Sequence, residues 1–175
     1  NEGLACLYNI ICWTPRPQGK LLHPSKPLSL MKPDNNLTRK RYDRIAPFFD
    51  LLEAPIEGLL FRDWRQRLWD KVTGHHILEV GVGTGKNFAY YPKSARITAV
   101  DYSPKMLQQA EQAKRRLDIP VELALMDVQA LCYADNSFDT VIGSFVFCSV
   151  PMPNKGLKEL HRICKPGGQI LLLEH

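Results

Sequence analysis

The sequence predicts an α/β protein built on a doubly wound, mostly parallel sheet. Short apolar runs alternate with helical patterns from His76 onward, as they do in folds where strands and covering helices follow one another. The first run, residues 77–80, leads directly into a turn with glycine at positions 81, 83 and 85. Glycine permits close approach to the backbone, and ligands of such sheets bind at the carboxyl ends of the strands. The pattern therefore also predicts a ligand site at this turn.

Residues 1–37 differ from the rest of the chain. They contain Pro15, Pro17, Pro24, Pro27 and Pro33, which exclude a long helix. The chain begins at Asn1, and Met31 precedes the first patterned segment, so a natural start at Met31 is expected. We expect residues 1–37 to be an irregular extension outside the natural domain, and residues 38–175 to be that domain, with both ends cut.

A helix is predicted over residues 56–72. Ile56, Leu60, Trp64, Leu68 and Val72 recur at four-residue spacing, while the basic residues of the segment fall on the remaining surface: Arg62, Arg65, Arg67 and Lys71. Such a helix packs its apolar stripe onto a sheet. A basic helix with tryptophans could alternatively lie on an anionic membrane.

The glycine turn follows a strand predicted at residues 76–80 and should open a helix at residues 86–90. Its pattern is E-x-G-x-G-x-G, beginning at Glu79. A dinucleotide site requires G-x-G-x-x-G, which this turn lacks. A glycine-rich turn without any ligand is the alternative reading.

A second strand, residues 96–100, ends at Asp101, 20 positions after Gly81. An acidic side chain at this place can accept hydrogen bonds from a ribose diol, although it could instead cap a turn. Ser103 then caps a helix that has Pro104 in its first turn.

Three further strands are predicted, at residues 121–125, 138–142 and 169–174, with a turn at residues 135–137 and a helix at residues 154–164. The first of these strands runs into Met126-Asp127-Val128, where Asp127 could simply cap a turn. A sharp turn at residues 165–168 precedes the last strand. Residues 143–150 form an apolar, aromatic stretch with Phe145 and Phe147, which suits a lipid or small apolar ligand unless it is core packing.

Composition limits the classes of function. Lysine and arginine number 23 against 18 aspartate and glutamate, a mild excess spread along the chain, so a nucleic-acid partner is not expected. The five cysteines form no C-x-x-C pair, which indicates neither a zinc site nor a secreted disulfide framework and favours a cytoplasmic location. No apolar stretch has the length needed to span a bilayer.

The motif at Glu79 resembles the first motif of class I S-adenosylmethionine-dependent methyltransferases. Residues 39–50, Arg-Lys-Arg-Tyr-Asp-Arg-Ile-Ala-Pro-Phe-Phe-Asp, resemble the amino-terminal segment of the ubiquinone and menaquinone biosynthesis methyltransferases and of bacterial phosphatidylethanolamine N-methyltransferases. The resemblance covers residues 39–175. It implies a Rossmann-like methyltransferase sheet, truncated after its fifth strand, because full members continue through a further helix and a final pair of strands.

The resemblance implies S-adenosyl-L-methionine as cofactor and no metal. The cofactor-binding residues that it implies are Tyr42, Glu79, Gly81, Gly83, Gly85, Asp101, Tyr102, Met106, Asp127, Val128 and Phe145. In such proteins the tyrosine at the position of Tyr42 lies over the cofactor, although packing a helix onto the core is an equal alternative. The carboxylate at the position of Asp127 accepts from the adenine amino group. No catalytic residue is identified, and His175 is a candidate base by position alone.

The expected function is transfer of the methyl group of S-adenosylmethionine to a small-molecule or lipid acceptor, such as a phospholipid amine or a quinone-like ring. The protein would be cytoplasmic, with possible peripheral contact to a membrane. An NAD-dependent oxidoreductase is one alternative. A non-catalytic domain that binds the cofactor or a partner is the other.

Overall fold

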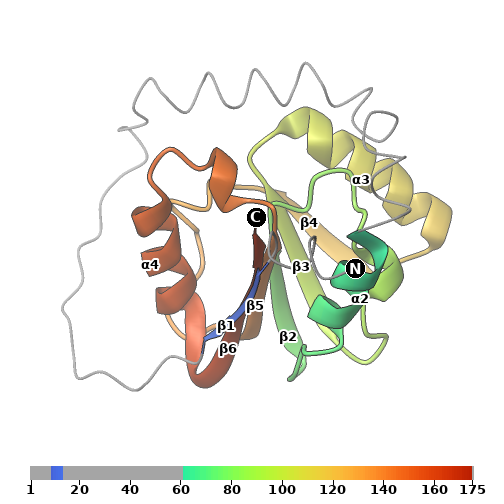
Figure 1. Cartoon of the computed structure of the whole chain (residues 1–175). Helices are drawn as coiled ribbons and strands as arrows, with labels where there is room; N and C mark the ends of the chain where they lie inside the picture. The colour runs from blue at the N-terminus through green and yellow to red at the C-terminus, as the bar shows by residue number, and fades with distance from the viewer. Residues whose placement is uncertain (1–8, 14–60, 175) are drawn as a thin grey trace, which may run out of the picture.

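A six-stranded sheet forms the centre of the structure, a computed structural model that describes residues 9–13 and 61–174 (Figure 1). The elements in chain order are β1 (Asn9–Trp13), α2 (Arg62–Trp69), β2 (His76–Val80), η2 (Phe88–Tyr90), β3 (Arg96–Asp101), α3 (Pro104–Leu117), β4 (Val121–Leu125), β5 (Phe138–Ser144), η3 (Phe147–Ser149), α4 (Pro153–Ile163) and β6 (Cys164–Glu174).

The strands lie in the order β1-β6-β5-β2-β3-β4. All neighbouring pairs among β2 to β6 are parallel, which confirms the predicted doubly wound, mostly parallel sheet. Since β2 lies between β3 and β5, the strand order reverses beside β2, where a doubly wound sheet places its ligand crevice.

The sixth strand, β1, lies inside the segment that was expected to be irregular. Asn9–Trp13 pairs antiparallel with β6, with Asn9 opposite Glu174 and Trp13 opposite Ile170. Its sequence, Asn-Ile-Ile-Cys-Trp, contains β-branched and aromatic residues that favour strands. This pairing satisfies backbone groups along the outer edge of β6.

Helices cover both faces of the sheet (Figure 1). Alternate residues of a strand point to opposite faces, so Ile77 of β2 packs in the cluster of buried residues under α2 and α3, whereas Leu78 packs in the cluster under α4. The two layers of apolar contacts hold the sheet between the helices and leave the ends of its strands for a site.

Two predicted helices differ from the structure. Within the described residues, the helix expected over residues 56–72 spans Arg62–Trp69 and ends before Val72; residues 56–60 lie outside the described part. The helix expected to open at residues 86–90 is a single 3-10 turn, Phe88–Tyr90. Tyr91 has an extended backbone because the following Pro92 disfavours the helical conformation there.

The turn predicted at residues 165–168 lies within β6 as a bulge. Cys164 pairs with Phe138 and Gln169 with Thr140, so residues 165–168 lie opposite Asp139 alone. Asp139 stabilises this corner by accepting hydrogen bonds from Lys165 Nζ at 2.7 Å and from the backbone N–H of His76 at 2.9 Å.

Candidate cofactor site

The glycine turn after β2 presents open backbone at Gly83. All three of its glycines have positive φ, at +68° for Gly81, +57° for Gly83 and +87° for Gly85. A Cβ at Gly81 would overlap Val146, and one at Gly85 would lie 2.6 Å from the ring of Phe88. A Cβ at Gly83 has no atom of the described residues within 4 Å. Gly81 and Gly85 therefore accommodate the protein's own packing, whereas Gly83 borders space that a ligand could occupy.

Asp101 connects this turn to the next strand. Its Oδ2 accepts from the backbone N–H of Gly83 at 2.8 Å, and its Oδ1 accepts from the backbone N–H of Ser103, also at 2.8 Å. These bonds fix the carboxylate beside the open backbone. An ionised carboxylate only accepts hydrogen bonds, so Asp101 suits ligand hydroxyl groups, which donate them.

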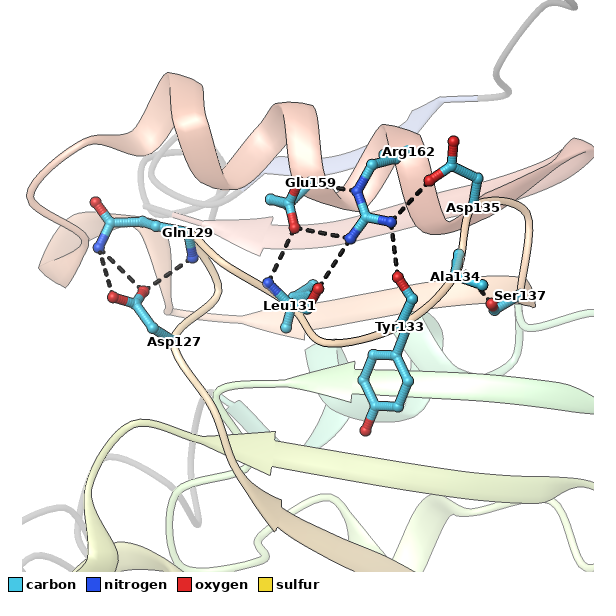
Figure 2. A network of polar contacts seen from close by, with 9 residues as sticks. All are labelled: Asp127, Gln129, Leu131, Tyr133, Ala134, Asp135, Ser137, Glu159 and Arg162. Carbon is cyan, nitrogen blue, oxygen red and sulfur yellow. Dashed lines mark hydrogen bonds and ion pairs between the residues drawn. The ribbon is translucent and has the colours of Figure 1, made fainter. Parts of the chain in front are cut away.

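Asp127 holds the corresponding place after β4. Its Oδ1 accepts from the backbone N–H of Gln129 at 2.8 Å, and the side-chain amide of Gln129 donates to both carboxylate oxygens (Figure 2). Because β2, β3 and β4 are adjacent and parallel, Gly83, Asp101 and Asp127 lie along one edge of the sheet. Two carboxylates beside a bare backbone are suited to a ligand that carries hydroxyl and amino donors.

The loop that carries Asp127 is fixed to α4 by hydrogen bonds from two paired side chains of that helix (Figure 2). Arg162 donates to the backbone oxygens of Leu131 at 2.9 Å and Tyr133 at 2.7 Å, and it pairs with Glu159 at 2.9 Å. Glu159 in turn accepts from the backbone N–H of Leu131 at 2.9 Å. Backbone groups of an irregular loop are thereby satisfied, which holds the loop in one conformation.

Phe145 borders the site on the other side, after β5. Its φ of +57° is unusual for an aromatic residue. The next two backbone N–H groups, of Val146 and Phe147, donate to Oε1 of Glu174 at 3.0 and 3.1 Å. The ring of Phe145 lies 5.1 Å from that of Phe61. Phe145 is thus part of an aromatic wall whose backbone is held by a carboxylate of β6.

A buried polar network lies beneath the glycine turn. Arg65 of α2 is 6% exposed and donates to Oδ1 of Asn87 at 2.9 Å and to Ser144 Oγ at 3.1 Å. Asn87 donates to one carboxylate oxygen of Glu79 at 2.5 Å, and the Tyr91 hydroxyl donates to the other. Arg65 was expected on the helix surface; it is buried because it supplies donors to this network.

Glu79 is the acidic centre of the network. It is completely buried, and burial raises its pKa from 4.5 to about 7, against the opposing effects of the hydrogen bonds from Tyr91 and Asn87 and of the charge of Arg65. Burial and the charge of Glu79 also raise the pKa of Tyr91, so its hydroxyl stays protonated and donates. Glu79 therefore fixes the residues that follow the turn from inside the protein.

The remaining predicted residues lie in different environments. Tyr42 and His175 lie outside the described residues. Met106 and Val128 are buried, at 2% and 8% exposure, whereas Tyr102 is partly exposed directly after β3. The sequence interpretation missed the residues that hold the site in place: Arg65, Asn87, Gln129 and Glu174. A signal existed only for Asn87, a polar residue two positions after the last glycine of the turn.

The described residues lack both a metal-binding cluster and a membrane-spanning helix. They contain no group of three or more histidine, cysteine, aspartate or glutamate side chains placed to hold a metal ion. None of their helices combines the length and apolar character that crossing a bilayer requires.

Comparison with known proteins agrees with this geometry. The sequence model of a family described as a methyltransferase domain matches residues 78–172. The chain is 36% identical over 104 residues to a phosphatidylethanolamine N-methyltransferase of Cereibacter sphaeroides, covering 58% of this chain and 51% of the relative. It is 30% identical over 145 residues to a ubiquinone/menaquinone biosynthesis C-methyltransferase of Geotalea daltonii, covering 78% and 62%.

Solved structures show the same fold. The crystal structure of the [4+2]-cyclase SpnF superposes with a TM-score of 0.66 at 21% identity, covering 79% of this chain and 59% of that one. A likeness at this identity concerns architecture alone. The chain spans about half to three fifths of the length of the two curated relatives described above.

The parallel sheet, the E-x-G-x-G-x-G turn and the acidic residues after β3 and β4 define a Rossmann-like nucleoside-binding protein. Within that class, the chain belongs to the methyltransferase-domain family, and its predicted place among the class I S-adenosylmethionine-dependent methyltransferases is confirmed. The comparisons give no support to the alternative of an NAD-dependent oxidoreductase.

The residues present fit S-adenosylmethionine. Gly83 borders open space among the described residues, and the carboxylates of Asp101 and Asp127 follow neighbouring strands at the same edge. The described residues between the turn and β3 form only a 3-10 turn, so they offer no α-helix whose amino end could face a pyrophosphate. S-adenosylmethionine has no phosphate and needs none.

Proposed function

We propose that the protein containing this chain transfers the methyl group of S-adenosylmethionine to a lipid or small apolar acceptor. The observation that carries the proposal is the bond from Gly83 N–H to Asp101, because it places a fixed carboxylate beside the open backbone of the turn. Asp101 would accept from the ribose hydroxyls and Asp127 from the adenine amino group. Gly83 would contact the cofactor through its backbone, and Tyr42 remains a proposed residue over the cofactor.

The chemical demand on the protein is modest. The bound cofactor supplies an activated methyl group and its own leaving group, which departs as S-adenosylhomocysteine. The residues of the chain would hold the cofactor in line with the acceptor and keep water out, which are effects of positioning and exclusion. The aromatic wall at Phe145 and Phe61 supports an apolar acceptor, since it supplies apolar surface beside the site. Phe147 instead packs against the core cluster under α4.

The acceptor class follows from the same wall and from the relatives. The phosphatidylethanolamine enzyme and the ubiquinone/menaquinone enzyme are named for acceptors that combine a reactive group with a large apolar body. We therefore favour a phospholipid amine or a quinone-like ring. A cytoplasmic protein in peripheral contact with a membrane would reach either acceptor.

Binding and transfer are tested separately. Calorimetry with S-adenosylhomocysteine measures cofactor binding, and transfer of labelled methyl from S-adenosylmethionine is measured with phosphatidylethanolamine vesicles and with a demethylated menaquinone. Binding together with transfer to one acceptor is the expected result. Binding without transfer to any acceptor would favour a non-catalytic cofactor-binding domain, and failure to bind would contradict the proposal.

A further inference from the structure

Gln129 is a buried polar residue whose side chain contacts two segments that lie far apart in the sequence. Its side chain is 5% exposed. The amide nitrogen Nε2 donates to Asp127 Oδ1 at 3.0 Å and to Oδ2 at 3.1 Å, while the amide oxygen Oε1 accepts from the backbone N–H of Met152 at 3.1 Å. The side chain therefore connects the carboxylate after β4 to the amino end of α4.

The chemistry of these partners permits one orientation of the amide. A carboxylate only accepts and a backbone N–H only donates, so the NH₂ group of Gln129 must face Asp127 and its oxygen must face Met152. Rotation of an aspartate carboxylate about its last bond is otherwise broad. A donor placed across both oxygens restricts that rotation, and the backbone N–H of Gln129 holds Oδ1 as well, at 2.8 Å.

The other end of this connection is rigid. Met152 directly precedes Pro153, which begins α4, and α4 holds the same loop further along through Glu159 and Arg162 (Figure 2). Gln129 thus transmits the fixed position of α4 to the carboxylate of Asp127. Asp127 itself follows a strand end and has no helix to fix it.

We infer that Gln129 is a positioning residue for purine recognition: by orienting the Asp127 carboxylate, it makes the site selective for a purine with a 6-amino group over one with a 6-oxo group. The inference rests on the proposed function, since it assumes that a nucleoside lies at this edge. A 6-amino group donates to a fixed carboxylate, whereas a 6-oxo group presents an oxygen that the same carboxylate repels. Discrimination between the 6-amino and the 6-oxo group requires a carboxylate whose orientation is fixed.

The test measures calorimetric dissociation constants of the full chain for S-adenosylhomocysteine and for its inosine analogue, S-inosylhomocysteine. Wild type should prefer the adenosine compound by roughly 10-fold or more, the scale of a hydrogen bond to a charged acceptor. Gln129→Met retains the size of the side chain and removes both contacts, so the preference should fall to roughly threefold or less. The fall should come mainly from weaker binding of S-adenosylhomocysteine.

Gln129→Glu separates the two contacts of the side chain. A carboxylate at position 129 still accepts from Met152 N–H but no longer donates to Asp127, so the preference should again be lost. Retention of the wild-type preference by this variant would overturn the inference. The variant also serves if Gln129→Met fails to fold.

Arg162→Lys is the matched control for general loosening of the loop. It removes bonds to Leu131 and Tyr133 without touching Asp127, so it should lower the melting temperature and keep the preference. Equal loss of preference in Arg162→Lys and Gln129→Met would show that Gln129 acts only through loop stability and would overturn the inference. Wild type that binds both compounds equally would overturn it while leaving the proposed function intact, and wild type that binds neither would contradict the proposed function itself.

Discussion

At the scale of single residues, two kinds of residue contribute to the candidate site. The first kind faces the ligand, and the second kind supports those residues from beneath. We propose that Asp101 and Gly83 are of the first kind, because their mutual hydrogen bond lies where the backbone is open. Glu79 and Arg65 belong to the second, because both are buried in the network beneath the turn. Substitutions of the two kinds should therefore give different results in binding and stability measurements.

Asp101→Ala should weaken binding of S-adenosylmethionine by about 1 to 3 kcal/mol, the usual cost of losing hydrogen bonds to a charged acceptor. Calorimetry measures the change. Glu122→Ala is the control, because Glu122 is exposed and pairs at 3.5 Å with Arg96, at the opposite end of β3. Unchanged affinity in Asp101→Ala would exclude Asp101 from the cofactor site.

Gly85→Val should mainly lower thermal stability, whereas Gly83→Val should mainly abolish cofactor binding. Both positions have positive φ, which costs a residue with a side chain about 1 to 2 kcal/mol. Gly85→Val additionally forces the ring of Phe88 to move, so its melting temperature should be lower than that of Gly83→Val. Gly83→Val should keep its helix content and lose cofactor binding. Wild-type affinity in Gly83→Val would refute contact between the cofactor and the turn.

Glu79→Gln should remove a pH dependence of stability. The pKa of Glu79 is about 7 in the folded state and 4.5 in the unfolded state. Between these pH values the folded state keeps the proton of Glu79 and the unfolded state loses it, so the stability of wild type falls as the pH rises from 4.5 to 7. The free energy of unfolding of Glu79→Gln relative to wild type should therefore increase by about 1 to 3 kcal/mol between pH 5 and pH 8. Denaturant titrations at the two pH values measure it, and a constant difference would contradict it.

At the scale of elements, α3 shows the closest agreement between sequence and structure. Ser103 accepts from the backbone N–H of Met106 at 3.1 Å, Pro104 occupies the first turn, and Asp118 ends the helix with φ of +51°. The cap at Ser103 and the place of Pro104 are local features, so the residue types alone predict them. The strands from β2 to β6 were predictable for a similar reason, because their apolar runs are bounded by turn residues.

Ser103→Ala tests the contribution of this cap. Loss of the side-chain acceptor leaves an N–H of the first turn without its partner, which should lower the free energy of unfolding by about 1 kcal/mol. Thermal or denaturant unfolding measures the change. Ser137→Ala, at a surface turn, gives a comparison in which a serine hydroxyl is lost outside any helix. Equal or greater loss in that variant would argue against a capping role.

Elements that depend on distant contacts could not be predicted from the sequence. The position of Arg65 depends on Asn87 and Ser144, 22 and 79 positions away. Gln129 is recognisable as a buried side chain only once α4 places Met152 beside it. A glycine turn usually opens a helix and so predicts one at residues 86–90, whereas Pro92 limits it to the 3-10 turn Phe88–Tyr90. Gly81, Gly83 and Gly85 were indistinguishable in the sequence, since only packing against Val146 and Phe88 separates them.

At the scale of the whole molecule, the sheet edge at β6 is covered by a segment from the other end of the chain. β1 lies next to β6 in Figure 1, and the register joins residues 9–13 to residues 170–174. The composition of residues 1–37 predicted an irregular extension outside the natural domain. The pairing indicates instead that part of this extension contributes to the sheet.

Deletion of residues 1–13 should lower the melting temperature and promote self-association, because it leaves the outer backbone groups of β6 unpaired. Scanning calorimetry and light scattering measure the two effects. Restoring residues 9–13 alone should recover most of the loss in melting temperature. An unchanged melting temperature after the deletion would instead support a domain that begins after residue 37.

The pairing of β1 with β6 also has a consequence for the order in which the molecule is made. The ribosome releases β1 well before β6 has been synthesised, and at about 5 to 20 residues per second the interval is on the order of ten seconds. Closing so long a loop carries an entropic cost that is offset only after β5 and β6 have formed a template. We therefore expect β1, which is translated before the five other strands of the described residues, to be incorporated after them, so that the nascent chain carries this strand unpaired until β6 has formed.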